Sequence, residues 1–187
     1  MAVINRIREQ EYRELALNEE DRLWELWDGV PEEKPGMSFD HDAVATYLGA
    51  MLINQLDRRD YWVNVNGGKA RRSDRYYFIP DVVVIPDSYA LRLRGDPRGF
   101  NAHAEPLPLV VEVWSPTTGQ YDFATKLHGY RERGDAEIWF IHPFERTLTA
   151  WRKQPDGRYQ EEHYEGGIVP VASLPGVTID LNALLDG

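Results

Sequence analysis

A single glutamate interrupts the apolar run at residues 109–114 (LVVEVW), and this run limits the possible folds more than any other stretch. A short run rich in β-branched residues predicts a buried strand. A buried carboxylate is costly unless it is neutralised, paired or bound to a metal ion. Side chains alternate along a strand, so Glu112 can face a cleft while Val111 and Val113 face the core. On this segment alone, a solvated sheet face or an arginine partner explains Glu112 equally well.

A second carboxylate precedes a second apolar run. Asp81 follows Pro80 and comes directly before residues 82–85 (VVVI), so it lies near the start of another predicted strand. Two acids on adjacent strands of one sheet can converge on a divalent cation. Such oxygen ligands suit Mg²⁺ or Mn²⁺.

A lysine lies on the helix predicted to follow the Glu112 strand. Asp122, Lys126 and Tyr130 are spaced four apart, so they share one helical face. A lysine on this face can reach back to the cleft and stabilise charge that develops on a phosphate. The alternative is a surface ion pair between Asp122 and Lys126, worth about 0.2–0.5 kcal/mol.

The remaining patterns predict an α/β (α+β mixed) protein with a central mixed β-sheet flanked by helices. Helical spacing or capping signals are found at residues 9–17, 40–57 and 120–133. Strand-like runs are found at residues 61–66, 76–87, 109–114 and 136–143, with hairpin turns near Asp28-Gly29 and residues 155–157. We expect residues 67–75 to form a turn-rich connection and residues 88–106 an irregular loop.

The chain length of 187 residues suits one domain with a sizeable core. We expect an N-terminal helix and hairpin at residues 9–33, a core at 38–145 and a C-terminal hairpin extension at 146–187. The absence of cysteine excludes disulfides, thiolate metal sites and cysteine nucleophiles. The first residues lack the apolar centre of a signal peptide, and no stretch approaches the ~18 apolar residues of a membrane span. We therefore expect a cytoplasmic protein with no membrane contact.

The formal net charge of −10 argues against a protein that coats nucleic acid without specificity. A local cluster of basic residues is the candidate for contact with a nucleic-acid backbone. It consists of Lys69, Arg71, Arg72 and Arg75, next to Tyr76 and Tyr77. A solvated loop that carries ordinary positive charge is an equal alternative.

Taken in order, these residues resemble the Uma-two family of putative restriction endonucleases, part of the PD-(D/E)XK nuclease superfamily. The matching stretches are residues 24–29, 80–84, 111–118 and 137–139, together with His41, Asp122, Lys126, Tyr130 and Gly134. The resemblance covers roughly residues 10–155. It implies a restriction-endonuclease-like core and a Mg²⁺- or Mn²⁺-dependent endonuclease that hydrolyses phosphodiester bonds, with DNA as the expected nucleic acid.

The resemblance also implies roles for particular residues. Asp81 and Glu112 would be the acidic metal ligands, and the backbone carbonyl of Val113 would be a third. The superfamily usually places its lysine two residues after the glutamate, where this chain has Trp114. In this family the following helix supplies the lysine, which makes Lys126 the candidate.

Glu25 and His41 match two further positions that the family places near the cleft. Asp122 and Tyr130 are candidate auxiliary residues, because they share the helical face of Lys126. Glu25 lies in the predicted N-terminal hairpin, and His41 lies at the start of the long helix. Taken alone, Glu25 is typical of an exposed hairpin residue. His41 alone is typical of a helix-start histidine with a structural hydrogen bond.

The alternative function is a catalytically silent binding or assembly module, because a fold does not establish an activity. Symmetric dimers are the commonest oligomers and duplex cleavage benefits from two sites, so we expect a homodimer. Other chemistries lack their motifs. Ser115 is outside any G-x-S-x-G setting, no phosphate-binding loop is present, and the histidines lack zinc-type spacing.

Overall fold

The computed structural model describes residues 5–19, 21–116 and 119–186, without the side chains of residues 119–122. Within these ranges the chain is a mixed α+β fold, as the sequence predicts. The helices are α1 (Glu9–Asn18), α2 (Phe39–Gln55), α3 (Asp87–Ala90), α4 (Gly119–Arg133) and α5 (Leu181–Asp186), with a 3₁₀ helix at Leu91–Leu93.

The largest sheet is mixed and has six strands. Its order is β11 (Tyr159–Tyr164), β10 (Thr147–Lys153), β9 (Glu137–His142), β8 (Leu109–Val113), β6 (Val82–Pro86) and β3 (Tyr61–Val65). Only β8 and β9 pair in parallel in this sheet. The predicted C-terminal hairpin supplies β10 and β11, which extend the sheet at one edge.

Two smaller sheets complete the described part of the chain. A five-stranded sheet has the order β2 (Val30–Glu33), β1 (Trp24–Trp27), β5 (Tyr76–Phe78), β4 (Lys69–Ser73) and β7 (Ala102–His103). A third sheet pairs β12 (Ile168–Pro170) with β13 (Thr178–Asp180). The hairpin turn of β1 and β2 has left-handed φ angles at Asp28 (51°) and Gly29 (81°), as the Asp-Gly signal predicts.

Three local predictions were wrong. Residues 67–75 contain the strand β4, because Ala70 is fully buried and the strand pairs with both β5 and β7. The predicted strand 76–87 is two strands, β5 and β6, in different sheets. Residues 88–106 contain α3, the 3₁₀ helix and β7. In each case pairing with distant strands or packing overrides local composition.

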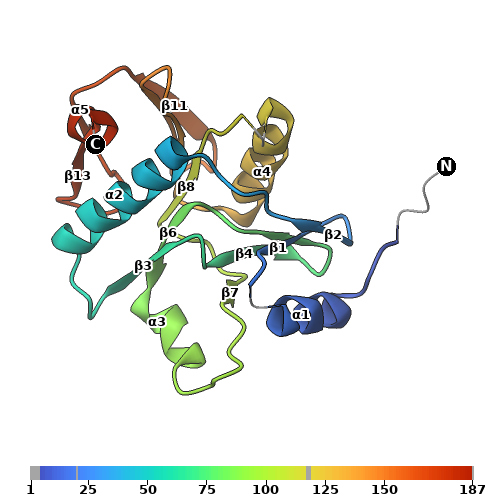
Figure 1. The fold of residues 1–187 in the computed structure, drawn as a ribbon. Coiled ribbons are helices and arrows are strands. Elements are labelled where there is room, and N and C mark those ends of the chain that lie inside the picture. Colours follow the sequence, from blue (N-terminus) through green and yellow to red (C-terminus); the bar gives the residue numbers. More distant parts are fainter. Residues whose placement is uncertain (1–4, 20, 117–118, 187) are drawn as a thin grey trace.

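The six-stranded sheet has a core on each face. One face buries Val82, Val84, Val111 and their neighbours against α2 and α5. The other face buries Val83, Val110 and the residues that point to the same side of the sheet, and it packs against α4 and the five-stranded sheet. Figure 1 shows α2 beside α5 and β13, whereas α4 and the β1–β2 hairpin lie away from α5.

The two long helices begin or end where the sequence predicts. The Ser38 hydroxyl accepts a hydrogen bond from the His41 N–H at 3.4 Å and caps α2. Helix α4 ends before Gly134, whose φ of 79° is left-handed. No described helix is long and apolar enough to cross a membrane. The division of the chain into one domain stays a prediction.

Candidate active site

The register of β6 and β8 brings Asp81 next to Glu112. Val82 pairs with Val111 in this antiparallel ladder, and the Asp81 N–H donates to the Val111 carbonyl at 3.0 Å. The residue before Val82 therefore lies opposite the residue after Val111. The Val113 N–H also donates to Asp81 Oδ2 at 2.6 Å. The two carboxylates are nearly buried, with exposed fractions of 1% for Asp81 and 7% for Glu112.

Strand alternation directs Glu112 towards α4. It shares the parity of Val110, whose side chain packs on the α4 side of the sheet. Lys126 Nζ donates to Glu112 Oε2 at 3.2 Å, and the Tyr130 hydroxyl donates to Glu112 Oε1 at 2.5 Å. The structure therefore places Glu112 in the interior, with its partners supplied by α4.

Glu25 joins the same group from β1. Its carboxylate accepts from the Ile79 N–H at 2.6 Å and from Trp27 Nε1 at 2.9 Å. Lys126 Nζ lies 2.9 Å from Glu25 Oε1. Glu25 is only 5% exposed, so it is not a solvated hairpin residue. Lys126 is also buried and bridges Glu25 and Glu112, and thus it is not a surface residue paired only along its helix.

His41 reaches the site from the first turn of α2. It is fully buried, and its Nε2 lies 3.0 Å from Asp81 Oδ2 while its Nδ1 lies 3.3 Å from Asp42 Oδ1. Burial opposes the charged imidazole, but Asp81 outweighs this effect and raises the pKa of His41.

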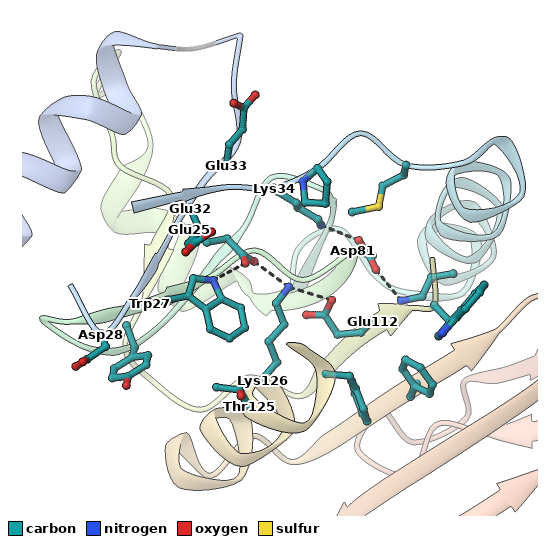
Figure 2. A pocket seen from close by; sticks show the side chains of 17 residues that line it. Glu25, Trp27, Asp28, Glu32, Glu33, Lys34, Asp81, Glu112, Thr125 and Lys126 are labelled. Atoms are coloured by element: carbon teal, nitrogen blue, oxygen red, sulfur yellow. Dashed lines mark hydrogen bonds and ion pairs between the residues drawn. The ribbon is translucent and has the colours of Figure 1, made fainter. Parts of the chain in front are cut away.

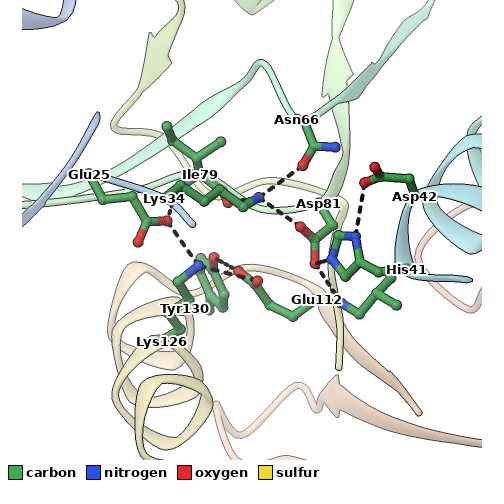
Figure 3. Close-up of polar contacts among 11 residues, drawn as sticks. Glu25, Lys34, His41, Asp42, Asn66, Ile79, Asp81, Glu112, Lys126 and Tyr130 are labelled. Atoms are coloured by element: carbon green, nitrogen blue, oxygen red, sulfur yellow. Dashed lines mark hydrogen bonds and ion pairs between the residues drawn. The ribbon is translucent and has the colours of Figure 1, made fainter. Parts of the chain in front are cut away.

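Sequence reasoning missed Lys34, which follows β2. Its Nζ donates to Asp81 Oδ1 at 2.7 Å, to the Ile79 carbonyl at 2.9 Å and to Asn66 Oδ1 at 2.9 Å (Figure 3). In the sequence it lies in EEKPG, beside two acids, a context typical of a solvated turn. No local signal distinguishes it, because its partners come from residues 32 to 47 positions away.

The two central carboxylates have opposite pKa shifts. Burial would raise the pKa of Asp81, but Lys34 and then His41 outweigh it, so that this pKa lies well below its usual value. Burial raises the pKa of Glu112; Lys126 works against this effect and the Asp81 charge adds to it. Burial opposes the charge on Lys126, yet Glu112 and Glu25 raise its pKa. The cations around Asp81 thus favour its ionised form, whereas burial disfavours the ionised form of Glu112.

The site opens into a cavity of about 560 Å³ (Figure 2). Its charged lining has six carboxylates and two lysines. These are Glu25, Asp28, Glu32, Glu33, Asp81 and Glu112, with Lys34 and Lys126. Trp27, Tyr76, Trp114, Phe123 and Phe140 supply aromatic walls. The lining is therefore strongly acidic, and a polyanion can approach only if cations compensate for this charge.

The donor set fits Mg²⁺ or Mn²⁺. Within the described ranges, no three His, Asp or Glu side chains are arranged to hold a metal ion. However, Mg²⁺ is usually held by one or two carboxylates and keeps several waters. Asp81 and Glu112 supply two such carboxylates on one cavity wall. Val113 also lines this wall.

The structure pairs the predicted nucleic-acid-binding residues with protein groups. Arg71 Nε lies 2.7 Å from Glu9 Oε1, Arg72 forms an ion pair with Glu132, and Arg75 lies 2.7 Å from Asp28 Oδ1. The Lys69 ammonium lies 5.5 Å from the centre of the Phe100 ring, and burial lowers its pKa. These contacts reduce the positive charge free for phosphate, and the binding role stays a prediction. The Asp122 side chain lies outside the described residues.

The sheet, its flanking helices and the clustered acids and lysine define a restriction-endonuclease-like fold. Residues 9–182 match the model of the Uma2 family, described as putative restriction endonuclease, and the chain belongs to this family. Its fold is similar to that of a putative nuclease belonging to DUF820 from Anabaena variabilis. The TM-score is 0.76 at 20% identity, over 96% of this chain and 98% of that one. No curated protein matches the chain.

Proposed function

We propose that this protein is a Mg²⁺- or Mn²⁺-dependent endonuclease that hydrolyses phosphodiester bonds of DNA. The observation that carries the proposal is the placement of Asp81 opposite Glu112, with Lys126 in contact with Glu112 in one cavity. Family membership supports a nucleic acid as the partner, because the family is described as putative restriction endonucleases.

The proposed metal ligands are Asp81, Glu112 and the backbone carbonyl of Val113. A bound divalent cation supplies Lewis-acid activation of water and neutralises phosphate charge. The chain's own groups prepare for this chemistry. The Val113 N–H fixes Asp81 Oδ2, and the Tyr130 hydroxyl fixes Glu112 Oε1, so both carboxylates are oriented before a ligand arrives.

Lys126 is the proposed electrostatic catalyst. Its ammonium is buried between Glu25 and Glu112, so it is oriented and desolvated. A cation in such a water-poor site stabilises charge that develops on a pentavalent phosphate more strongly than a solvated one does. Glu25 is a positioning residue, because it holds Lys126 without being a proposed metal ligand.

A cleavage assay tests the proposal. Purified wild-type protein and Lys126→Ala are incubated with Mg²⁺ and with varied DNA and RNA substrates. Cleavage of DNA by the wild type alone is expected. Equal background rates for both proteins on every substrate would contradict nuclease activity. A silent binding module remains the rival, and it predicts no Mg²⁺ binding that depends on Asp81 and Glu112. Calorimetry on the wild type and Asp81→Ala separates the two.

We also propose a homodimer, since symmetric dimers are the commonest oligomers and cleavage of a duplex benefits from two active sites. Light scattering across working concentrations tests this assembly. A monomeric mass at every concentration would contradict it.

A further inference from the structure

Lys34 is a second buried cation for which the proposed reaction gives no role. Its side chain is only 3% exposed. Three oxygens surround its ammonium at 2.7–2.9 Å, one each from Asp81, Ile79 and Asn66. A lysine buried to this degree is unusual unless its charge is compensated, and here Asp81 compensates it.

The three oxygens form a cradle around this ammonium. Backbone hydrogen bonds fix both the chain that carries Lys34 and the chain that carries Asn66. The Lys34 N–H donates to the Leu23 carbonyl at 2.7 Å, which fixes the backbone from which the side chain extends. Asn66 has a left-handed φ of 53°, and its N–H donates to the Asp81 carbonyl at 2.9 Å. Asparagine adopts this conformation more readily than most other residues that carry a side chain.

The three oxygens are of the types that bind hard metal ions. A carboxylate, a backbone carbonyl and a side-chain amide oxygen all occur as ligands of Ca²⁺ and Mg²⁺. Nucleases with two metal ions hold them about 3.5–4 Å apart. In this chain, Asp81 directs Oδ1 to Lys34, whereas Oδ2 contacts Val113 and His41 (Figure 3).

We propose that the Lys34 ammonium fills a cation position at Asp81 that a second metal ion would otherwise occupy, so that the site takes a single divalent cation. This inference rests on the proposed function, because it concerns the same metal site. Lys34 is thereby a built-in cation, distinct from Lys126, which contacts Glu25 and Glu112 instead.

The buried charges favour one divalent ion. Glu25, Asp81 and Glu112 carry three negative charges, and the two lysines carry two positive charges. Counted with every carboxylate ionised and without His41, one negative charge remains. One divalent cation and one phosphodiester together make the site neutral. A second divalent ion would leave two positive charges uncompensated where water is scarce, and a proton on His41 would increase this excess.

Counting bound Mn²⁺ by calorimetry tests the inference. Lys34→Ala removes the ammonium and opens the cradle, whereas Lys34→Met removes the charge but keeps most of the volume. We expect one Mn²⁺ per chain in the wild type, two in Lys34→Ala and one in Lys34→Met. Lys153→Ala is the matched control, because Lys153 is exposed and should leave the count at one.

The outcomes separate this inference from the proposed function. Two ions in the wild type, or one ion in Lys34→Ala, would overturn the inference and leave metal dependence intact. No ion in the wild type but one in Lys34→Ala would uphold the cation position and contradict the proposed function. No ion in either would overturn both. If Lys34→Ala does not fold, the anomalous signal of a wild-type crystal soaked in Mn²⁺ decides: one peak supports the inference, and a second peak within about 4 Å of the first overturns it.

Discussion

Lys126 Nζ lies 2.9 Å from Glu25 Oε1, so helix α4 and strand β1 meet in a buried ion pair. The two residues are 101 positions apart in the sequence. Both residues line the cavity, and Lys126 also contacts Glu112. The geometry of the proposed site therefore depends on the docking of the N-terminal hairpin as well as on the central sheet.

Replacing Lys126 with methionine should destabilise the fold. The change leaves Glu25 and Glu112 as buried carboxylates without their shared cation, and breaking a buried pair in this way costs on the order of 3 kcal/mol. Urea unfolding at pH 8 measures the loss. Lys153→Met, at an exposed site, should change stability by less than about 0.5 kcal/mol. Equal stability of the two variants would contradict a structural role for the ion pair.

Replacing Glu112 with glutamine should separate folding from metal binding. The amide keeps the shape of the side chain and an acceptor for Tyr130, so the circular dichroism spectrum should not change. Loss of one ligand charge should weaken Mn²⁺ binding by at least about tenfold. Calorimetry compares this variant with Glu165→Gln, which changes an exposed glutamate. If Glu112→Gln bound Mn²⁺ as well as that control, Glu112 would not be a ligand.

Removing the Tyr130 hydroxyl should cost more than removing the same group at the surface. Tyr130 is fully buried and donates to Glu112, whereas Tyr164 donates to Glu162 at a partly exposed position. Tyr130→Phe leaves the buried Glu112 Oε1 without its hydroxyl donor, although Lys126 still contacts Oε2, and should cost about 1–3 kcal/mol. Tyr164→Phe should cost less than about 1 kcal/mol. Thermal and urea unfolding of both variants test the difference, and the reverse order would contradict it.

Stability should fall on acidification partly because of His103. This histidine is 2% exposed, and burial lowers its pKa to about 4. An unfolded histidine binds its proton near pH 6.5, so the stability contribution is complete above that pH and is lost as the pH falls towards 4. The slope approaches 1.4 kcal/mol per pH unit for one such group.

The matched variant for this pH effect is His103→Gln, which retains a donor for Asn101 but does not titrate in this range. Its unfolding free energy should fall less steeply than that of the wild type between pH 6.5 and pH 4. Urea titrations at several pH values measure both slopes. Parallel curves would show that His103 does not contribute.

The predicted nucleic-acid contacts can be tested by the salt dependence of binding. If Arg72 and Arg75 contact phosphates, each alanine substitution should weaken binding to all DNA sequences and reduce the salt slope by about one. Glu112→Gln, which the proposed mechanism expects to be inactive, is a suitable background for anisotropy titrations. Unchanged slopes would show that the ion pairs with Glu132 and Asp28 persist and that the arginines serve the fold instead.

Local patterns in the sequence were sufficient to predict the main helices and the central strands. Ser38, the helical apolar spacing and Gly134 define α2 and α4, because caps and periodicity act within a few residues. The apolar runs around Glu112 and after Asp81 likewise predict strands. Strand β4 could not be predicted in this way, since it contains charged residues and becomes a strand only by pairing with β5 and β7.

The candidate site shows the same division. Its acids and Lys126 could be nominated because charged residues beside apolar runs, and the family resemblance, draw attention to them. Lys34 could not be nominated, because nothing in its local sequence distinguishes it from a solvated lysine.

The sequence by itself determined the mixed α+β class, the long helices and the placement of two carboxylates on predicted strands. These follow from short-range propensities and from the alternation of side chains along a strand. Only the tertiary structure decided that Asp81 lies opposite Glu112, that Glu25 and Lys126 pair, and that Lys34 occupies an oxygen cradle at Asp81. Each of these contacts joins segments that are distant in the sequence. A buried charge is stable only when it is paired, and its partner is set by which elements pack around it.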